Sequence, residues 1–219
     1  MRILVCLEGT SYTGKTTVAR LLSEKMPAIY GPRVANGWEG QEEEIHKNPN
    51  PLARFSFFMK EIAVRSEQVS RLLEQTDVVM DRYLLSVFAY HNVIVGEQLE
   101  AGIDTSGLRQ PDYAVLLTVD EATLRQRMKN RPPRHQYESD PTFLLEVQRE
   151  FLQLIDREKT IVVDTSIQPA EEAARTILEE FVRRGFISSQ FPQRELKRGN
   201  HICVITPCFF ARSPTNSRR

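Results

Sequence analysis

The strongest constraint on the fold lies near the N-terminus, where residues 9–16 read G-T-S-Y-T-G-K-T and match the pattern G-x-x-x-x-G-K-[ST]. Continuous aliphatic residues precede them over residues 2–8, as in a strand buried on both faces of a parallel sheet. The apolar spacing of residues 16–26 predicts a helix directly afterwards. Glycine at both ends of the loop lets successive N–H groups turn inward toward phosphate oxygens. The sequence therefore predicts a strand, a phosphate-binding loop and a helix in succession.

The side chains of this loop predict its ligand. Lys15 would bridge the β- and γ-phosphates of a nucleoside triphosphate, and the Thr16 hydroxyl would bind Mg²⁺. The helix that begins here would add its dipole to the anion site. The nucleotide-binding residues predicted from this stretch are Gly9, Thr10, Ser11, Tyr12, Thr13, Gly14, Lys15, Thr16 and Thr17.

Short apolar runs alternate with helical patterns over the first 180 residues, which is typical of a parallel α/β sheet. Further strands are expected at residues 28–30, 77–81, 112–120 and 160–164. Further helices are expected at about residues 52–74, after Asp120, from the N-cap pair Asp140-Pro141, and over 169–184 up to Gly185. Right-handed crossovers would place these helices on both faces of one sheet and gather the loops at the carboxyl ends of the strands.

Composition excludes several classes of partner. The 219-residue chain carries 29 basic and 29 acidic residues, so no net field would draw it to nucleic acid or to an anionic membrane. Its three cysteines lack the paired spacing of metal ligands, and no apolar run approaches the roughly 20 residues that cross a bilayer. Because the first residues enter a strand directly, we expect a cytoplasmic protein without a signal peptide.

A second informative stretch begins where the strand at residues 77–81 ends in Asp81, followed by Arg82. A carboxylate at this point can assist Mg²⁺, directly or through water, and ligands of such sheets bind at the carboxyl ends of strands. An isolated Asp-Arg pair is usually a surface ion pair, but the phosphate-binding loop shifts the interpretation toward function. Thr16 and Asp81 are therefore the predicted Mg²⁺ residues.

The two stretches together resemble the thymidylate kinase family, which carries E-G-x-x-x-x-G-K-[ST]-T near its start and D-R-[YH]-x-x-S-x-x-A-Y-Q after its third strand. The matching residues here are Glu8, Gly9, Gly14, Lys15, Thr16 and Thr17, then Asp81, Arg82, Tyr83, Ser86, Ala89 and Tyr90. The stretch QPDYAVLLTVDEATLRQRMKNR is also similar to the family's fourth strand and the arginine-bearing segment after it. The resemblance covers roughly residues 3–182.

This resemblance implies a P-loop kinase domain over residues 1–185, of α/β class, with three layers, a five-stranded parallel sheet in the order 2-3-1-4-5, and a short lid at about 130–140. It implies transfer of the γ-phosphoryl group of ATP to a nucleoside monophosphate, with dTMP as our first choice of acceptor, and it suggests a homodimer. Residues 186–219, in which Lys and Arg outnumber the single acid Glu195, form a basic C-terminal extension without an assigned role.

The resemblance also implies roles for individual residues. Arg82 would hold the acceptor phosphate and Asp81 would organise Mg²⁺, while Arg131 and Arg134 in the lid would close over the donor phosphates. Arg127, beside the lid, is assigned to ATP, with a solvated helix face as the equal alternative. The predicted catalytic residues are Lys15, Asp81, Arg82, Arg131 and Arg134.

The acceptor site is predicted from fewer signals. The family's acceptor-binding arginine on the helix before the third strand corresponds by interval to Lys60, with Arg65 one turn further along. Phe58 would floor a base pocket unless it belongs to the core, and Tyr12 would stack on the acceptor base or stay exposed. The predicted acceptor-binding residues are Tyr12, Arg33, Phe58, Lys60, Arg65, Arg82 and Tyr90.

Departures from the family pattern keep other functions open. Ser11 and Tyr12 stand where these kinases usually have an aspartate that contacts the acceptor sugar, and His91, expected to be packed on a helix, replaces a glutamine. The stretch GPRVANGW (31–38) is similar to the E-P-V-x-x-W of deoxynucleoside kinases, but Gly31 replaces the acid that would serve as base. The absence of this acid favours a monophosphate acceptor, unless Glu39, Glu42 or Asp81 serves as the base in its place. A nonenzymatic nucleotide-binding regulator is the third alternative.

Overall fold

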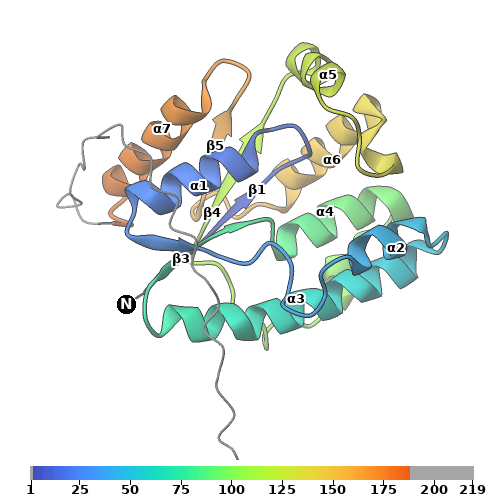
Figure 1. The fold of residues 1–219 in the computed structure, drawn as a ribbon, viewed down its shortest axis with the longest axis horizontal. Helices are drawn as coiled ribbons and strands as arrows, with labels where there is room; N and C mark the ends of the chain where they lie inside the picture. Colours follow the sequence, from blue (N-terminus) through green and yellow to red (C-terminus); the bar gives the residue numbers. More distant parts are fainter. Residues whose placement is uncertain (1, 188–219) are drawn as a thin grey trace, which may run out of the picture.

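Five strands form one parallel sheet in the order β2-β3-β1-β4-β5 (Figure 1). In the computed structural model, which describes residues 2–187, they are β1 (Leu4–Glu8), β2 (Ala28–Tyr30), β3 (Asp77–Asp81), β4 (Tyr113–Thr118) and β5 (Thr160–Asp164). All five residues of the central strand β1 are buried, as its unbroken aliphatic sequence predicts. The class, the strand number and the strand order are therefore confirmed.

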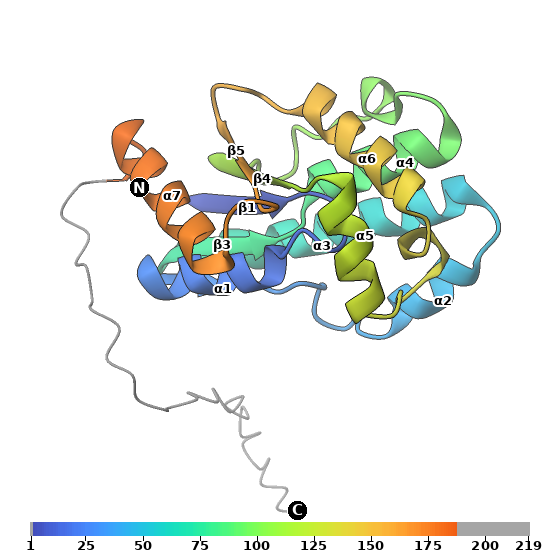
Figure 2. The same cartoon turned by 90° about the horizontal axis from the view of Figure 1, so that it is seen from above.

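Helices cover both faces of the sheet, which gives the three predicted layers (Figures 1 and 2). They are α1 (Lys15–Lys25), α2 (Gln41–Lys47), α3 (Pro51–Leu73), α4 (Leu84–Val95), α5 (Glu121–Asn130), α6 (Pro141–Leu154) and α7 (Ala170–Arg183), with short 3-10 helices η1 (Leu99–Gly102) and η2 (Gln136–Glu138). Val5 and Leu7 of β1 pack toward α1 and α7, whereas Leu4 and Cys6 pack toward α3 and α4.

The helix ends follow the signals in the sequence. The Asp120 carboxylate accepts from Thr123 N–H at 2.6 Å and begins α5, and Asp140 accepts from Thr142 N–H at 2.8 Å and begins α6. Gly185 follows α7 with a positive φ of 74°. The fourth strand is shorter than residues 112–120, because Asp120 already serves as the cap of α5. Helix α2, which follows Gly40, was not predicted from the sequence.

The described chain continues past the predicted domain boundary at residue 185. The Phe186 ring stacks on Tyr113 with ring centroids 3.6 Å apart, and Ile187 is buried in the cluster that contains Phe181. These two residues therefore belong to the folded domain, while the remainder of the predicted extension lies outside the described residues. Within residues 2–187, none of the helices combines the length and apolar character needed to span a membrane.

The topology brings the two sequence motifs together. β1 pairs with β3 in a register that sets Leu7 opposite Asp81, so the loop after β1 lies beside the residues after β3. Figure 2 shows α2 and α5 at the end of the molecule toward which the strands point. The carboxyl ends of the strands thus form the floor of the site described below.

Gly9 supports the loop for a steric reason. Its φ is +133°, and a Cβ at this position would lie 2.3 Å from the Leu117 carbonyl oxygen. We expect Gly9→Ala to lower the free energy of unfolding by about 2–4 kcal/mol, because a strained backbone and a backbone clash combine. Urea denaturation measures this change.

The matched control is Gly107→Ala, because Gly107 has no atom within 4 Å of an added Cβ and no positive φ. We expect it to change the free energy of unfolding by less than about 0.5 kcal/mol. Equal stability of the two variants would contradict this account of Gly9.

Candidate active site

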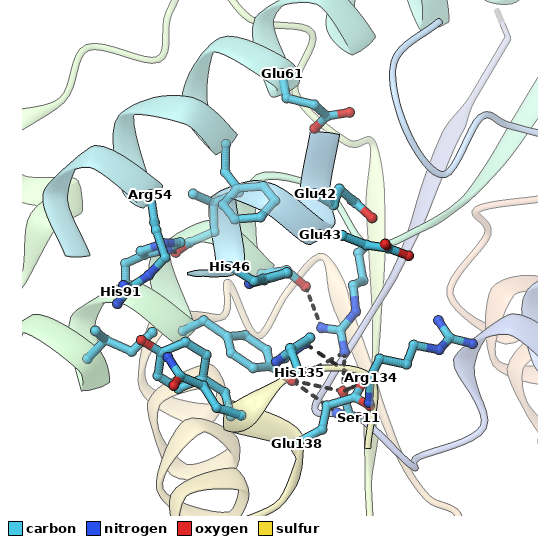
Figure 3. A pocket seen from close by; sticks show the side chains of 18 of the residues that line it. Ser11, Glu42, Glu43, His46, Arg54, Glu61, His91, Arg134, His135 and Glu138 are labelled. Carbon is cyan, nitrogen blue, oxygen red and sulfur yellow. Dashed lines mark hydrogen bonds and ion pairs between the residues drawn. The ribbon is translucent and has the colours of Figure 1, made fainter. Parts of the chain in front are cut away.

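Two adjoining cavities open at the carboxyl ends of the strands. The loop cavity, of about 360 Å³, is lined by residues of the phosphate-binding loop together with Asp81, Arg127 and Arg131. The helical cavity, of about 840 Å³, is lined mainly by α2, α3, α4 and the lid (Figure 3). The residues that line both cavities are Ser11, Arg33, Arg82, Arg134 and Glu138. We call this common set the shared wall.

The loop cavity has the features of a triphosphate site. Lys15 is buried, its Nζ donates to the Thr10 carbonyl and, at 3.2 Å, to Thr13 Oγ1, and burial lowers its pKa well below the ordinary lysine value. Gly14, with φ at 85°, begins α1, so the N-terminus of that helix faces the cavity. Gly9, Thr10 and Thr13 belong to the loop but do not line the cavity.

Thr16 and Asp81 fit a magnesium ion. The Thr16 hydroxyl donates to an Asp81 carboxylate oxygen, which places two oxygen ligands side by side at the mouth of the loop cavity. Among residues 2–187 there is no cluster of three or more His, Cys, Asp or Glu that could hold a metal ion. A hydroxyl, one carboxylate and nucleotide phosphates are the ligand set typical of Mg²⁺ in phosphoryl-transfer enzymes, so the residues present suit this ion.

Arg82 crosses the carboxyl end of β1 and binds the phosphate loop. Its backbone has a positive φ of 69°, and its N–H donates to the Leu7 carbonyl at 2.9 Å. Its guanidinium donates to the Gly9 carbonyl at 2.9 Å, to Ser11 Oγ at 3.1 Å, to Tyr90 Oη at 3.2 Å and to Ser86 Oγ at 3.3 Å. Each of these partners is uncharged. Burial alone would lower the pKa of Arg82, but Tyr90 and the nearby Asp81 and Glu8 raise it overall, so Arg82 presents a cation at the shared wall.

Glu8 supports Arg82 from below. Its buried carboxylate accepts from the Tyr83 N–H at 3.0 Å and from the Ser86 hydroxyl, which fixes the start of α4. Burial raises the pKa of the Glu8 carboxyl, and the hydrogen bond from Ser86 and the charge of Arg82 act in the opposite direction. Glu8 is therefore a positioning residue and does not face either cavity.

The lid contributes a buried carboxylate to the shared wall. Glu138 accepts from Ser11 Oγ at 2.7 Å and from Arg134 N–H at 3.0 Å, and it pairs with Arg131 at 3.3 Å. Burial alone would raise the pKa of Glu138, but the hydrogen bonds from Arg134 and Ser11 and the charge of Arg131 lower it overall. An ionised Glu138 thus joins the lid to the phosphate loop.

Two further contacts hold the loop against the lid and α5. The Arg131 guanidinium lies 4.2 Å from the centroid of the Tyr12 ring. Arg127 donates to the Tyr12 carbonyl at 2.9 Å and to the Thr165 carbonyl at 2.6 Å, so it is not part of a freely solvated helix face. Tyr12, with φ at 68°, therefore sits on the lid side of the loop.

The helical cavity has an aromatic and histidine-rich end. His46 of α2 stacks on His135 of the lid with ring centroids 4.1 Å apart, and both His46 and His91 lie near the ring of Phe58. Burial lowers the pKa of His46 and of His91 to about 4, so both rings are neutral at pH 7. The Nδ1 atom of His91 bonds to the Val87 carbonyl at 2.7 Å, which agrees with the packed histidine expected at this position.

The predicted acceptor residues differ in whether they line the helical cavity. Arg33, Phe58, Arg65, Arg82 and Tyr90 line the helical cavity. Tyr12 does not line that cavity, and its ring contacts the Arg131 guanidinium.

The structure does not bring Lys60 to either cavity. The residue is exposed and lines neither cavity, because it lies on the opposite face of α3 from Phe58 and Arg65.

Arg65 has a structural role within the cavity wall. Its Nε pairs with Glu61 at 3.1 Å, and its Nη1 donates to the carbonyls of Arg33 at 2.7 Å and Arg82 at 3.1 Å. It therefore positions Arg82, whose left-handed backbone needs an external support.

Sequence reasoning missed several cavity residues. The lid segment 130–140 contains two acids, Glu138 and Asp140. Because Asp140 was identified as a helix cap, Glu138 was left without a role, and this could have marked it as a site residue. Arg54 could have been found by its spacing of four residues from Phe58 on one face of α3. His46 and His135 carry no local signal, since their pairing depends on how α2 meets the lid.

Comparisons with known proteins agree with this geometry. The sequence model of the thymidylate kinase family matches residues 7–177. A probable thymidylate kinase of Methanocaldococcus jannaschii is 31% identical over 181 residues, covering 80% of this chain and 94% of the relative. A probable thymidylate kinase of Methanocorpusculum labreanum is 28% identical over 198 residues, covering 83% of this chain and 98% of the relative.

Solved structures show the same fold at lower identity. Thymidylate kinase from Candida albicans has a TM-score of 0.69 at 22% identity, covering 84% of this chain and 92% of that one. Deoxyadenosine kinase from M. mycoides with bound dATP has a TM-score of 0.59 at 16% identity, covering 82% of this chain and 99% of that one. The family match spans most of the chain and includes both motifs of the site, so this protein belongs to the thymidylate kinase family of phosphotransferases.

Proposed function

We propose that this protein transfers the γ-phosphoryl group of Mg-ATP to a nucleoside monophosphate, with dTMP as the first acceptor to test. The observation that carries the proposal is the shared wall, where the side chains of Arg33, Arg82 and Arg134 border both cavities. Phosphoryl transfer requires mainly positioning and positive charge around the transferred group. A donor phosphate in one cavity and an acceptor phosphate in the other would meet at these guanidinium groups.

On the donor side, the loop N–H groups, the N-terminus of α1 and Lys15 would hold the phosphates of ATP. Thr16 and Asp81 would hold Mg²⁺, which neutralises charge on the phosphoryl oxygens when it is bound. Arg131 and Arg134 would cover the phosphates from the lid and exclude water. Glu138 keeps the lid against the loop through Ser11, so that these arginines stay in place.

On the acceptor side, three guanidinium groups suit a phosphate better than they suit an uncharged hydroxyl. A nucleoside 5′-hydroxyl would instead need a carboxylate base, and the acids suggested for that role have different positions. Glu39 accepts from the Gly37 N–H away from both cavities, and Asp81 is bound to Thr16. Glu42 does line the helical cavity, and so does Glu138, which keeps a deoxynucleoside kinase as the second candidate.

The first test removes the cation of the phosphate loop. We expect Lys15→Ala to lower kcat for ADP release with dTMP by at least about 100-fold, as loss of one group that stabilises transition-state charge does elsewhere. A coupled ADP assay measures the rate, and thermal melting checks the fold.

The control for this test is Lys129→Ala, because Lys129 is exposed on α5 and should leave turnover unchanged. Near-normal turnover in a folded Lys15→Ala variant would contradict the assigned ATP site.

The second test concerns the acceptor phosphate. We expect Arg82→Lys to lower kcat/KM for the monophosphate by about 10- to 100-fold, because lysine keeps the charge but loses the planar fork. Calorimetric affinity for ATP should stay within a few-fold of the wild type. An equal loss in kcat/KM for the monophosphate and in affinity for ATP would show that Arg82 acts through the loop and not on the acceptor.

The same assay, run with thymidine in place of dTMP, separates the two candidate functions. Turnover with the monophosphate alone supports the proposal. Turnover with unphosphorylated nucleosides alone would replace it by a deoxynucleoside kinase, and ADP release that ignores every acceptor would indicate a nucleotide-binding regulator.

The third test concerns the lid. We expect Glu138→Gln to lower kcat by about tenfold, because the amide keeps the shape but loses the charge that holds Arg131. Trypsin should also cut faster after Arg134 in this variant. The control is Glu146→Gln on the exposed face of α6. Unchanged cleavage and unchanged turnover would show that Glu138 does not hold the lid.

A further inference from the structure

The stacked rings of His46 and His135 lie where helix α2 meets the lid, and the phosphoryl-transfer chemistry described above does not use them. Their centroids are 4.1 Å apart, their planes are 20° from parallel, and both residues line the helical cavity. Figure 3 shows the two histidines among the side chains of this cavity, with Arg54 and His91 on one side of them and Arg134 on the other. The stack therefore connects α2 to the lid within the wall of the cavity.

Helix α2 lies at the surface of the domain. It has seven residues, and none of its side chains is fully buried. The centroid of the His46 ring lies 5.5 Å from that of Phe58 on α3, and the same ring stacks on His135 of the lid. His46 is therefore a link from the long helix α3, through α2, to the lid.

The lid is held on two sides of Arg134. On the side of the phosphate loop, Glu138 accepts from Ser11 Oγ at 2.7 Å. On the side of the helices, His135 stacks on His46. The Arg134 N–H donates to Glu138 at 3.0 Å, but the Arg134 side chain is exposed. The position of this guanidinium at the shared wall therefore depends on how the lid backbone is held.

We propose that His46 is a positioning residue, which holds Arg134 at the shared wall through its stack on His135, and that protonation of the two histidines releases the lid. The inference rests on the proposed function, because Arg134 is one of the arginines that would cover the phosphates there. Two neutral rings in face-to-face contact favour the closed lid over the open one by about 3- to 10-fold.

The surroundings of His135 oppose its protonation in the closed lid. An imidazolium donates from both nitrogens, but the Nδ1 atom of His135 is buried and has no hydrogen-bond partner among residues 2–187. The Nε2 atom lies 4.0 Å from Glu138, which already accepts from Ser11 and Arg134. Because an unpaired buried donor is costly, a protonated His135 favours a lid that has left the stack.

The groups around the two rings act mostly in the same direction. Burial is the largest cause that lowers the pKa of both histidines. Glu138 raises the pKa of both, and the other groups lower the pKa of the ring that each of them faces. The charged and titratable groups that face the stack are Arg54 of α3, His91 of α4, Arg82 after β3, and Arg131, Arg134 and Glu138 of the lid.

The closed lid should therefore lose stability as the pH falls. An exposed histidine has a pKa of about 6.5, whereas the pKa of His46 in the closed lid is about 4. The open state binds the proton first, so the stack contributes fully above about pH 6.5 and progressively less down to about pH 4. At pH 5.5 the ratio of closed to open lid should be about tenfold lower than at pH 7.5. The lowered pKa of Glu138 keeps its carboxylate ionised over this range.

The first measurement is the protection of the bond after Arg134 against trypsin, in the full chain without nucleotide. A free peptide of residues 130–140 at the same pH is the reference, which corrects for the effect of pH on trypsin. We expect wild-type protection to fall by about tenfold from pH 7.5 to pH 5.5. His46→Phe combined with His135→Phe keeps two stacked rings that bind no proton, so its protection, against the matching peptide, should not change with pH.

The second measurement is the turnover of His46 variants. We expect His46→Ala to lower kcat with dTMP by about 3- to 10-fold, and protection at pH 7.5 by the same factor. His46→Phe, which restores the ring, should recover both. The control is Glu44→Gln on the same helix, because the Glu44 side chain is 76% exposed and lines neither cavity. Thermal melting checks the fold, and the phenylalanine variants decide the question if His46→Ala does not fold.

The possible outcomes separate this inference from the proposed function. Wild-type protection that stays constant between pH 7.5 and pH 5.5, or a fall that persists in the double phenylalanine variant, overturns the release by protons. Normal protection or normal kcat in folded His46→Ala overturns the positioning role and leaves the proposed function intact. The expected pattern of protection in a protein that phosphorylates no acceptor supports the link between α2 and the lid and overturns the proposed function.

Discussion

The left-handed backbone of Arg82 is the constraint on which the site depends. The register of β1 against β3 brings the Arg82 N–H to the Leu7 carbonyl at 2.9 Å, and the positive φ that follows turns the side chain across the end of β1. A non-glycine residue in this region costs about 1–2 kcal/mol. Four hydrogen bonds from its guanidinium and the hydrogen bond from Arg65 to its carbonyl offset that cost. One residue thereby joins the loop, α4 and α3.

Ser11 shows why this loop departs from the pattern of the family it belongs to. The Ser11 hydroxyl lies 2.7 Å from a carboxylate oxygen of Glu138, which is ionised and buried. A carboxylate at position 11 would face Glu138 at hydrogen-bond distance, and two like charges so close cannot both stay ionised. The hydroxyl instead donates to Glu138 and accepts from Arg82 at 3.1 Å. The substitution is therefore coupled to a lid that docks on the loop through its own acid.

Local signals were sufficient for most of the fold and for the phosphate-binding side of the site. Aliphatic runs predicted the strands, Asp120 and Asp140 predicted two helix starts, and the loop and Asp81 were recognised from consecutive residues. The acceptor side depends on longer-range packing. Counting an interval back from Asp81 selected Lys60, but an interval does not fix which face of a helix points inward. His46 meets His135 because of how α2 approaches the lid, and no pattern in either segment specifies that approach.

Helix α3 gives the helical cavity, the proposed acceptor site, a length that does not depend on the lid. Arg65 holds the carbonyl of Arg82 at the phosphate end, and Arg54 stands at the other end of the same cavity. Eleven residues of α-helix separate them, which is about 16 Å of rise. The lid meets both ends of this span, through Glu138 at Ser11 and through Tyr137 at Arg54. An acceptor that lay along this part of α3 would therefore lie beside both of these lid contacts.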